Sequence, residues 1–76
     1  MFEEVKNILV ENLQIDADTI KPESELVNDL GINSLELADL ILLCEEKYSI
    51  EVKDEDIHGF ITVGDIVNYL SEITGA

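Results

Sequence analysis

The chain has 76 residues, enough for one domain spanning residues 1–76. Eighteen Asp and Glu residues oppose four Lys residues and no Arg, which gives a formal net charge of −14. This acidity argues against nucleic acid or an anionic membrane as a partner, because both require a basic surface, and it favours partners whose own surfaces are basic.

The first helical pattern runs from Phe2 to Leu13. Apolar side chains recur at helical spacing, at positions 2, 5, 8, 9 and 13, with polar residues between them. The acids Glu3 and Glu4 distinguish this segment from a secretory signal peptide. We therefore predict an amphipathic helix here and a cytoplasmic location for the protein.

A long loop follows, from Gln14 to Asn33. It has no sustained period and contains typical loop residues, including Pro22 and Gly31. A loop of about twenty residues is uncommon in a compact domain and usually has a function or packs on itself. Six aliphatic side chains are candidates for holding it against the core: Ile15, Ile20, Leu26, Val27, Leu30 and Ile32.

The strongest helical pattern covers Ser34 to Tyr48. Asn33 is a favoured N-cap residue, and Glu36 three positions later completes a pattern that resembles a capping box. An inward stripe is predicted for Leu37, Leu40, Ile41, Cys44 and Tyr48.

The same helix holds the only cysteine and the longest apolar run. The run, Leu40 to Cys44, is far too short to span a bilayer. One cysteine excludes an internal disulfide and a multi-cysteine zinc site. We interpret Cys44 as a small core residue rather than a reactive thiol.

Shorter elements are predicted for the last third of the chain. A brief helical turn is expected over Glu55 to Gly59, capped by Asp54. Thr62 opens a final helix, with Asp65 as its capping-box partner. Apolar positions recur at helical spacing up to about Thr74, and Gly75 ends the helix.

Ser34 is the candidate functional residue. At the first position of a long helix its hydroxyl is reachable, and the free N–H groups and positive dipole end of the helix suit a phosphate. Spacing alone also allows an ordinary surface serine beside a cap.

The residues around Ser34 resemble a known motif. Asp29-Leu30-Gly31-Ile32-Asn33-Ser34-Leu35 is similar to the phosphopantetheine attachment motif of acyl carrier proteins, D-L-G-x-D-S-L. The resemblance continues through Glu45-Glu46-Lys47-Tyr48 and Thr62 to Leu70, and covers nearly the whole chain. One departure is Asn33, where the family usually has Asp. The missing carboxylate could change the contact with the transferase that attaches the arm.

The resemblance implies an all-α fold, a four-helix bundle with three long helices, one short helix and a long first loop. It implies that Ser34 receives 4'-phosphopantetheine from coenzyme A through a phosphopantetheinyl transferase. The thiol of this arm holds acyl cargo as thioesters for fatty acid or related synthase enzymes, so the protein is a carrier and not an enzyme. A flexible tether raises the effective concentration of the cargo at each docked enzyme. We expect a monomer.

The resemblance also implies a docking surface on the second helix. Acids there would meet basic patches on partner enzymes and set the association rate; the alternative is a solvated helix face. The acidic candidates are Glu36, Asp39, Glu45 and Glu46. Two apolar contacts are candidates, with core packing as the alternative: Leu35 and Leu42.

Family members can shelter an acyl chain between helices, and here the surplus of aliphatic residues offers candidates. They either line such a cleft or simply fill the core. These residues are Leu40, Ile41, Cys44, Val52, Ile57, Phe60 and Leu70.

Other functions fit less well. A catalytic Ser34 needs a base and an orienting acid, and a G-x-S-x-G elbow is absent because Glu36 stands where the second Gly belongs. His58, the only histidine, is interpreted as an exposed residue without a catalytic task. No calcium-binding loop motif occurs. The open alternative is a small acidic helical adaptor for protein interactions, without a prosthetic group.

Overall fold

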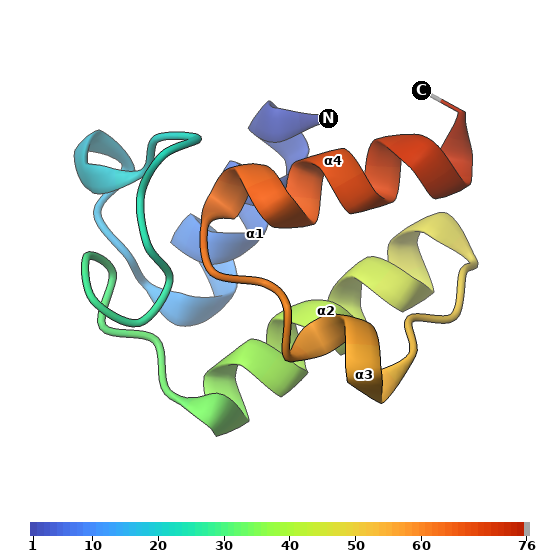
Figure 1. Ribbon diagram of the computed structural model, residues 1–76. Helices are drawn as coiled ribbons and strands as arrows, with labels where there is room; N and C mark the ends of the chain where they lie inside the picture. The colour runs from blue at the N-terminus through green and yellow to red at the C-terminus, as the bar shows by residue number, and fades with distance from the viewer. Residues whose placement is uncertain (76) are drawn as a thin grey trace.

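The computed structural model describes residues 1–75 and is all-helical over that range (Figure 1). Its α-helices are α1 (Phe2–Leu13), α2 (Ser34–Tyr48), α3 (Asp54–Ile57) and α4 (Val63–Thr74), and a short 3₁₀ helix, η1 (Ala17–Thr19), lies in the first loop. Three long helices and one short one confirm the predicted fold class. The bounds of α1 and α2 are those that the apolar period predicts.

The long helices enclose an aliphatic core. α1 contacts both α2 and α4, and the Tyr48 hydroxyl at the end of α2 donates a hydrogen bond to Glu4 of α1. Each buried aliphatic side chain stabilises the fold by about 1.5–3 kcal/mol. The buried core residues are Val5, Ile8, Leu9, Ile20, Leu26, Ile32, Leu40, Ile41, Cys44, Val52, Val63, Ile66 and Leu70.

Cys44 is fully buried in this core, as predicted. Burial raises the pKa of its thiol to about 11, because the low-dielectric interior disfavours the charged thiolate. Most of the residues considered for an acyl-sheltering cleft share this buried environment; Ile57 and Phe60 are the partly buried exceptions.

The first loop is held in place by both apolar and polar contacts. Ile20, Leu26 and Ile32 enter the core as expected. The buried Ser24 hydroxyl donates to the Thr19 carbonyl at 2.9 Å and accepts from the Lys21 N–H at 3.0 Å. These bonds satisfy a polar group that would otherwise be costly to bury.

The expectation that Val27 anchors the loop is wrong, because its side chain is 64% exposed. Its neighbour Leu26 is buried, and the Leu26 N–H donates to the Ile61 carbonyl at 2.9 Å. With Leu26 directed into the core, the adjacent side chain lies on the outside.

The first loop is also bonded to the start of α4. The N–H groups of Val63 and Gly64 donate to the carbonyls of Ser24 and Pro22, at 3.0 and 2.8 Å. A Cβ atom on Gly64 would lie 2.9 Å from the Pro22 carbonyl oxygen, so glycine permits this close approach. The loop and α4 therefore form one connected unit.

The short helix α3 begins one residue earlier than predicted. Lys53, in an extended conformation, occupies the N-cap position, and its carbonyl accepts hydrogen bonds from the N–H groups of Asp56 and Ile57. Asp54 is thus already helical and does not cap the helix with its side chain. Within residues 1–75, no helix combines the length and apolarity needed to cross a membrane.

Candidate functional site at the start of α2

The turn before α2 presents its first residues to solvent. Gly31 adopts a positive φ of 68°, a conformation that glycine adopts without strain. Ile32 then enters the core, 2% exposed, and its N–H donates to the Leu26 carbonyl at 2.9 Å. Anchored by this buried side chain, the chain starts α2 at the molecular surface.

A capping box closes the start of α2, as predicted. The Glu36 N–H donates to Asn33 Oδ1 at 2.9 Å, and the Asn33 N–H donates to Glu36 Oε1 at 3.2 Å. Asn33 thus performs the capping role that Asp has in the common motif. The box fixes the direction in which the first helical residues point.

Ser34 and Leu35 are the first two helical residues, and both are exposed. The hydroxyl of Ser34 is therefore reachable by another protein. The N–H groups of a first helical turn lack partners within the helix, and together with the helix dipole they favour a nearby phosphate. The position fits a serine that carries a phosphodiester.

Four of the candidate docking residues form one exposed stripe along α2. Leu35, Asp39, Leu42 and Glu46 follow one another at intervals of four, three and four residues, so they share a helix face. All four are exposed, with Leu35 at 80% and Leu42 at 52%. Packing in the core, the alternative for the two leucines, is therefore wrong.

Asp39 and Leu42 also border a shallow cavity of about 260 Å³ between α1 and α2, which includes Leu13 of α1. The stripe thus combines two charges, two apolar side chains and a recess.

The other two acidic candidates have partners within the chain. Glu36 belongs to the capping box. Glu45 Oε2 accepts a hydrogen bond from the Val52 N–H at 2.7 Å, which joins α2 to the segment before α3. Sequence reasoning missed this second bond, because it depends on how the chain returns after Ser49.

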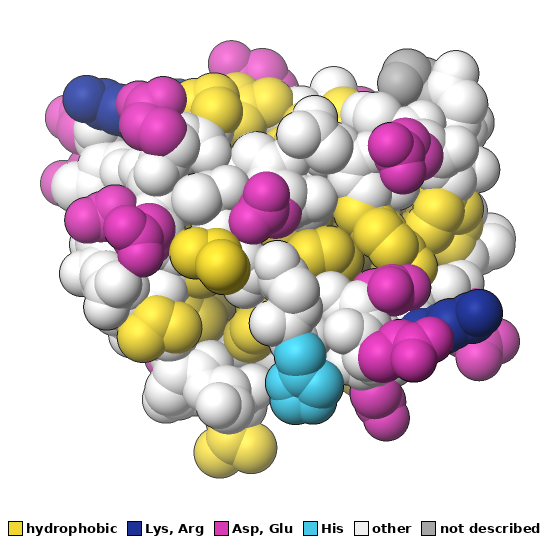
Figure 2. Space-filling model, viewed as in Figure 1, with side chains coloured by type: hydrophobic (Ala, Val, Ile, Leu, Met, Phe, Trp, Pro, Cys, Tyr) yellow, Lys and Arg dark blue, Asp and Glu magenta, His cyan; other side chains and the backbone are white. Residues whose placement is uncertain are grey.

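A cavity of about 430 Å³ opens beside Ser34. Its apolar wall comes from the first loop, α2, α3 and the segment after α3: Val27, Leu37, Ala38, Ile57 and Phe60. Its polar residues are Ser34, Asp54 and His58. In the space-filling view the single histidine lies at the surface, with hydrophobic side chains visible close by (Figure 2).

This cavity brings together residues that the sequence keeps apart. His58 is exposed, as expected, but its position at the same cavity as Ser34 was not predicted. The exposed Val27 contributes to the wall as well. An arm attached to Ser34 would have an apolar recess beside its attachment point, so the residues present fit a phosphopantetheine group.

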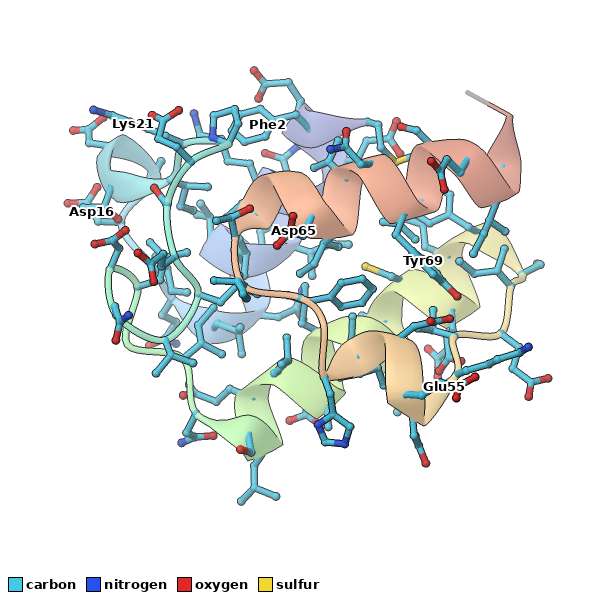
Figure 3. All side chains as sticks on the ribbon, viewed as in Figure 1. Phe2, Asp16, Lys21, Glu55, Asp65 and Tyr69 are labelled. Atoms are coloured by element: carbon cyan, nitrogen blue, oxygen red, sulfur yellow. The ribbon has the colours of Figure 1, made fainter. Side chains whose placement is uncertain are left out.

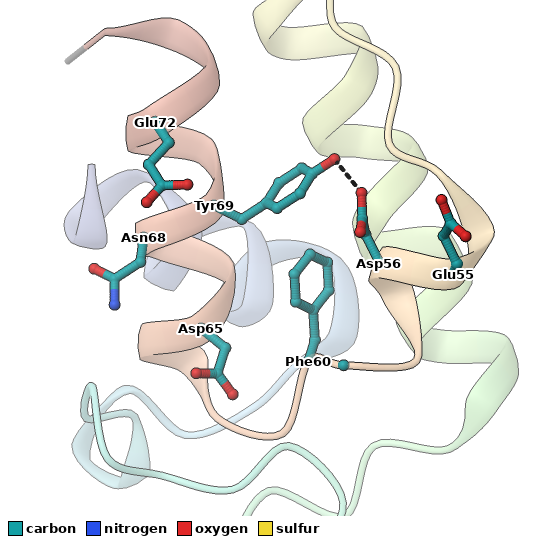
Figure 4. A pocket seen from close by; sticks show the side chains of 8 residues that line it. Glu55, Asp56, Phe60, Asp65, Asn68, Tyr69 and Glu72 are labelled. Carbon is teal, nitrogen blue, oxygen red and sulfur yellow. Dashed lines mark hydrogen bonds between the residues drawn. The ribbon is translucent and has the colours of Figure 1, made fainter.

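A second cavity, of about 340 Å³, lies between α3 and α4 (Figure 4). Tyr69 extends from α4 towards α3 (Figure 3) and donates from its hydroxyl to Asp56 Oδ2 at 2.8 Å. The Phe60 and Tyr69 rings meet edge to face, 5.2 Å between centroids. The remaining wall is largely acidic, with Glu55, Asp65 and Glu72.

The contacts around this second cavity join α3 to α4. The hydrogen bond to Asp56 raises the pKa of the Tyr69 hydroxyl, since the carboxylate stabilises the protonated phenol. Phe60 borders this cavity and also the cavity beside Ser34.

Residues 3–70 match the family described as "Phosphopantetheine attachment site". The class is therefore that of small carrier domains whose prosthetic group is 4'-phosphopantetheine.

Similar proteins cover nearly the same length. The acyl carrier protein of Campylobacter jejuni (strain RM1221) is 44% identical over 72 residues, which is 95% of this chain and 94% of the relative. That of Clostridium perfringens (strain SM101 / Type A) is 43% identical over 74 residues, 97% of each chain. That of Campylobacter lari is 37% identical over 73 residues, 96% of this chain and 95% of the relative. The chain belongs to the acyl carrier protein family.

Family membership confirms the main functional predictions. The protein carries acyl groups on 4'-phosphopantetheine. It interacts with synthase enzymes and with a phosphopantetheinyl transferase. It is a carrier and not itself an enzyme. An adaptor without a prosthetic group is not favoured.

Proposed function

We propose that Ser34 is the residue that carries the arm, within a single carrier domain of residues 1–76. The observation that carries this proposal is the exposed position of Ser34 at the start of α2, beside an apolar cavity of about 430 Å³. The match of Asp29 to Leu35 with the attachment motif supports the same residue. When bound, the group supplies a thiol at the end of a flexible tether.

Attachment is a phosphoryl transfer from coenzyme A. The Ser34 Oγ forms a new bond to the phosphorus next to the pantetheine, and the bond from that phosphorus to the adenosine bisphosphate leaving group breaks. The serine proton passes to a base on the transferase. In this chain the capping box holds Ser34 in place, and the positive end of α2 offsets the charge of the new phosphodiester.

Mass spectrometry tests the attachment residue. Incubation with coenzyme A and a broad-specificity transferase should add one arm to the wild-type protein and none to Ser34→Ala. Ser49→Ala is the matched control, since Ser49 is also exposed and also lies at an end of α2. Modification of the Ser34→Ala variant, or its loss in Ser49→Ala, would refute the assignment.

We also propose that partners with basic patches dock on the stripe of Leu35, Asp39, Leu42 and Glu46, with Glu36 and Glu45 adding to the acidic field. Opposite charges across such an interface chiefly raise the association rate. The exposed leucines provide apolar contacts, which the charges surround.

Charge neutralisation tests the docking surface without disturbing the capping box. Glutamine can replace glutamate in such a box, so Glu36→Gln with Asp39→Asn removes two charges and retains the cap. Glu3→Gln with Glu72→Gln, on exposed residues near the ends of the chain, removes the same charge elsewhere. The first pair should slow association with the transferase several-fold more than the second, with a difference that shrinks as salt rises. Equal slowing would show that only net charge matters, and the docking roles would be withdrawn.

We propose further that the protein acts as a monomer in the cytoplasm. A net charge of −14 opposes self-association. A chain whose only cysteine is buried and free suits a reducing compartment. Sedimentation at low and moderate salt tests the monomer, and a stable dimer at both would refute it.

A further inference from the structure

His58 differs from every other residue at the cavity beside Ser34 in that its side chain can become positively charged. Among the described residues that line this cavity, those from α2 and the first loop are uncharged: Ser34, Leu37, Ala38 and Val27. From α3 and the segment after it come the acid Asp54, the imidazole of His58 and two apolar side chains. The residues lining the cavity include none of the four lysines.

The charge on an attached arm makes this position significant. A phosphodiester at Ser34 adds a further negative charge to a chain whose formal charge is already −14. The helix end offsets part of that cost. A cation lining the same cavity would offset more, because charge-assisted contacts to phosphate oxygens are among the stronger hydrogen bonds.

Asp54 is the acid among the described residues that line this cavity. It lies four residues before His58, and the backbone N–H of His58 donates to the Asp54 carbonyl at 3.4 Å. The side chains at this cavity that can carry a charge are Asp54 and His58 in the unmodified chain, and the phosphodiester joins them in the modified chain.

We propose that the imidazolium of His58 contacts the phosphodiester of an arm carried on Ser34 and holds the phosphate end of the arm over the cavity. This inference rests on attachment at Ser34. His58 is a positioning residue and takes no part in acyl transfer. Because histidine changes its charge between about pH 5 and 8, the contact strengthens as pH falls through this range and weakens as pH rises.

Nuclear magnetic resonance tests the contact without any activity assay. The midpoint of the His58 titration, followed through its ring carbon-bound protons, is compared between the unmodified and the arm-carrying protein. It should move upward by about 0.5 pH unit or more, the shift expected in water for unit charges roughly 6 Å apart. The phosphorus resonance of the arm should titrate with the same midpoint, although a phosphodiester itself does not titrate there.

Three variants make the result specific. In arm-carrying His58→Gln the phosphorus resonance should be flat from about pH 5 to 8. Ser34→Ala treated with coenzyme A and transferase should keep the unmodified midpoint. In Asp54→Asn the upward shift on attachment should persist; its disappearance would show that the shift arises from Asp54, and would overturn the proposal.

Failure of attachment and failure of the contact are distinguishable. A protein that gains no mass at Ser34 refutes the attachment proposal. A protein that gains the mass of the arm but keeps the His58 midpoint, or keeps a titrating phosphorus resonance in His58→Gln, refutes only the role of His58.

Discussion

The starts of α2 and α4 use the same local device for different purposes. Each has a capping box, Asn33 with Glu36 in α2 and Thr62 with Asp65 in α4. At α4 the first two helical residues, Val63 and Gly64, donate their N–H groups to carbonyls of the first loop. The first N–H groups of α4 are thus already hydrogen-bonded to the first loop.

At α2 the corresponding residues, Ser34 and Leu35, are exposed. The positive end of this helix is therefore available to a group attached from outside. A capping box is thus combined with loop contacts at the start of α4 and with an exposed first turn at the start of α2.

The largest expected effect is at Gly64. Gly64→Ala places a Cβ 2.9 Å from the Pro22 carbonyl oxygen, so the loop or the helix must shift. We expect the free energy of unfolding to fall by about 1–3 kcal/mol, as for other overpacked sites. Leu35→Ala at the corresponding position of α2 should change it by less than about 0.5 kcal/mol. Urea denaturation measures both, and equal losses would contradict the distinction between the two helix starts.

A smaller effect is expected from Asp65→Asn, and it should depend on pH. The N–H groups of Thr62 and Ile61 donate to Asp65 and lower the pKa of its carboxyl below the usual 3.8. A depressed pKa means that the carboxylate stabilises the fold above the unfolded value and loses this effect as pH falls through the folded value. The variant should lose about 0.3–1 kcal/mol at pH 7, the range for a carboxylate in the first turn of an exposed helix.

The difference between wild type and Asp65→Asn should then shrink progressively below pH 3.8. Denaturation at several pH values measures it. Comparing the two proteins at each pH cancels the contribution of the other acids. A difference that stays constant down to the lowest pH would show that the charge of Asp65 contributes nothing.

The smallest effect on stability is expected from Asn33→Asp, because both residues cap a helix well. We expect the free energy of unfolding to change by only a few tenths of a kcal/mol. The rate of arm attachment by a transferase adapted to the common motif should rise, since the substitution restores the usual residue before Ser34. Mass spectrometry of reaction samples quenched at successive times measures the rate. An unchanged or lower rate would rule out Asn33 as a limit on recognition.

Local patterns were sufficient to predict the three long helices and the capping boxes of α2 and α4, whereas the start and the N-cap of the short helix α3 were predicted wrongly. The bounds of α1 and α2, both capping boxes and the role of Gly75 depend on residues within one or two turns of each other. Ile20, Leu26 and Ile32 were also correctly expected in the core.

The sequence pattern could not predict which residues far apart in the chain come together in the fold. Leu26 and Val27 are both aliphatic, and which of them is buried depends on contacts with distant residues, such as the hydrogen bond from the Leu26 N–H to the Ile61 carbonyl. Likewise, the position of His58 beside Ser34 depends on where α3 packs. Phe60 and the Tyr69–Asp56 hydrogen bond fix that placement across the fold.

The burial of Cys44 has a consequence for the chemistry of a thioester carrier. A thioester can be attacked by any nearby thiolate, with transfer of its acyl group. With a pKa of about 11, the Cys44 thiol is ionised at pH 7 in only roughly one molecule in ten thousand, and its sulfur lies inside the core. We therefore expect no transfer of the acyl group to Cys44, and alkylating reagents at neutral pH should label the arm and spare the protein's own cysteine.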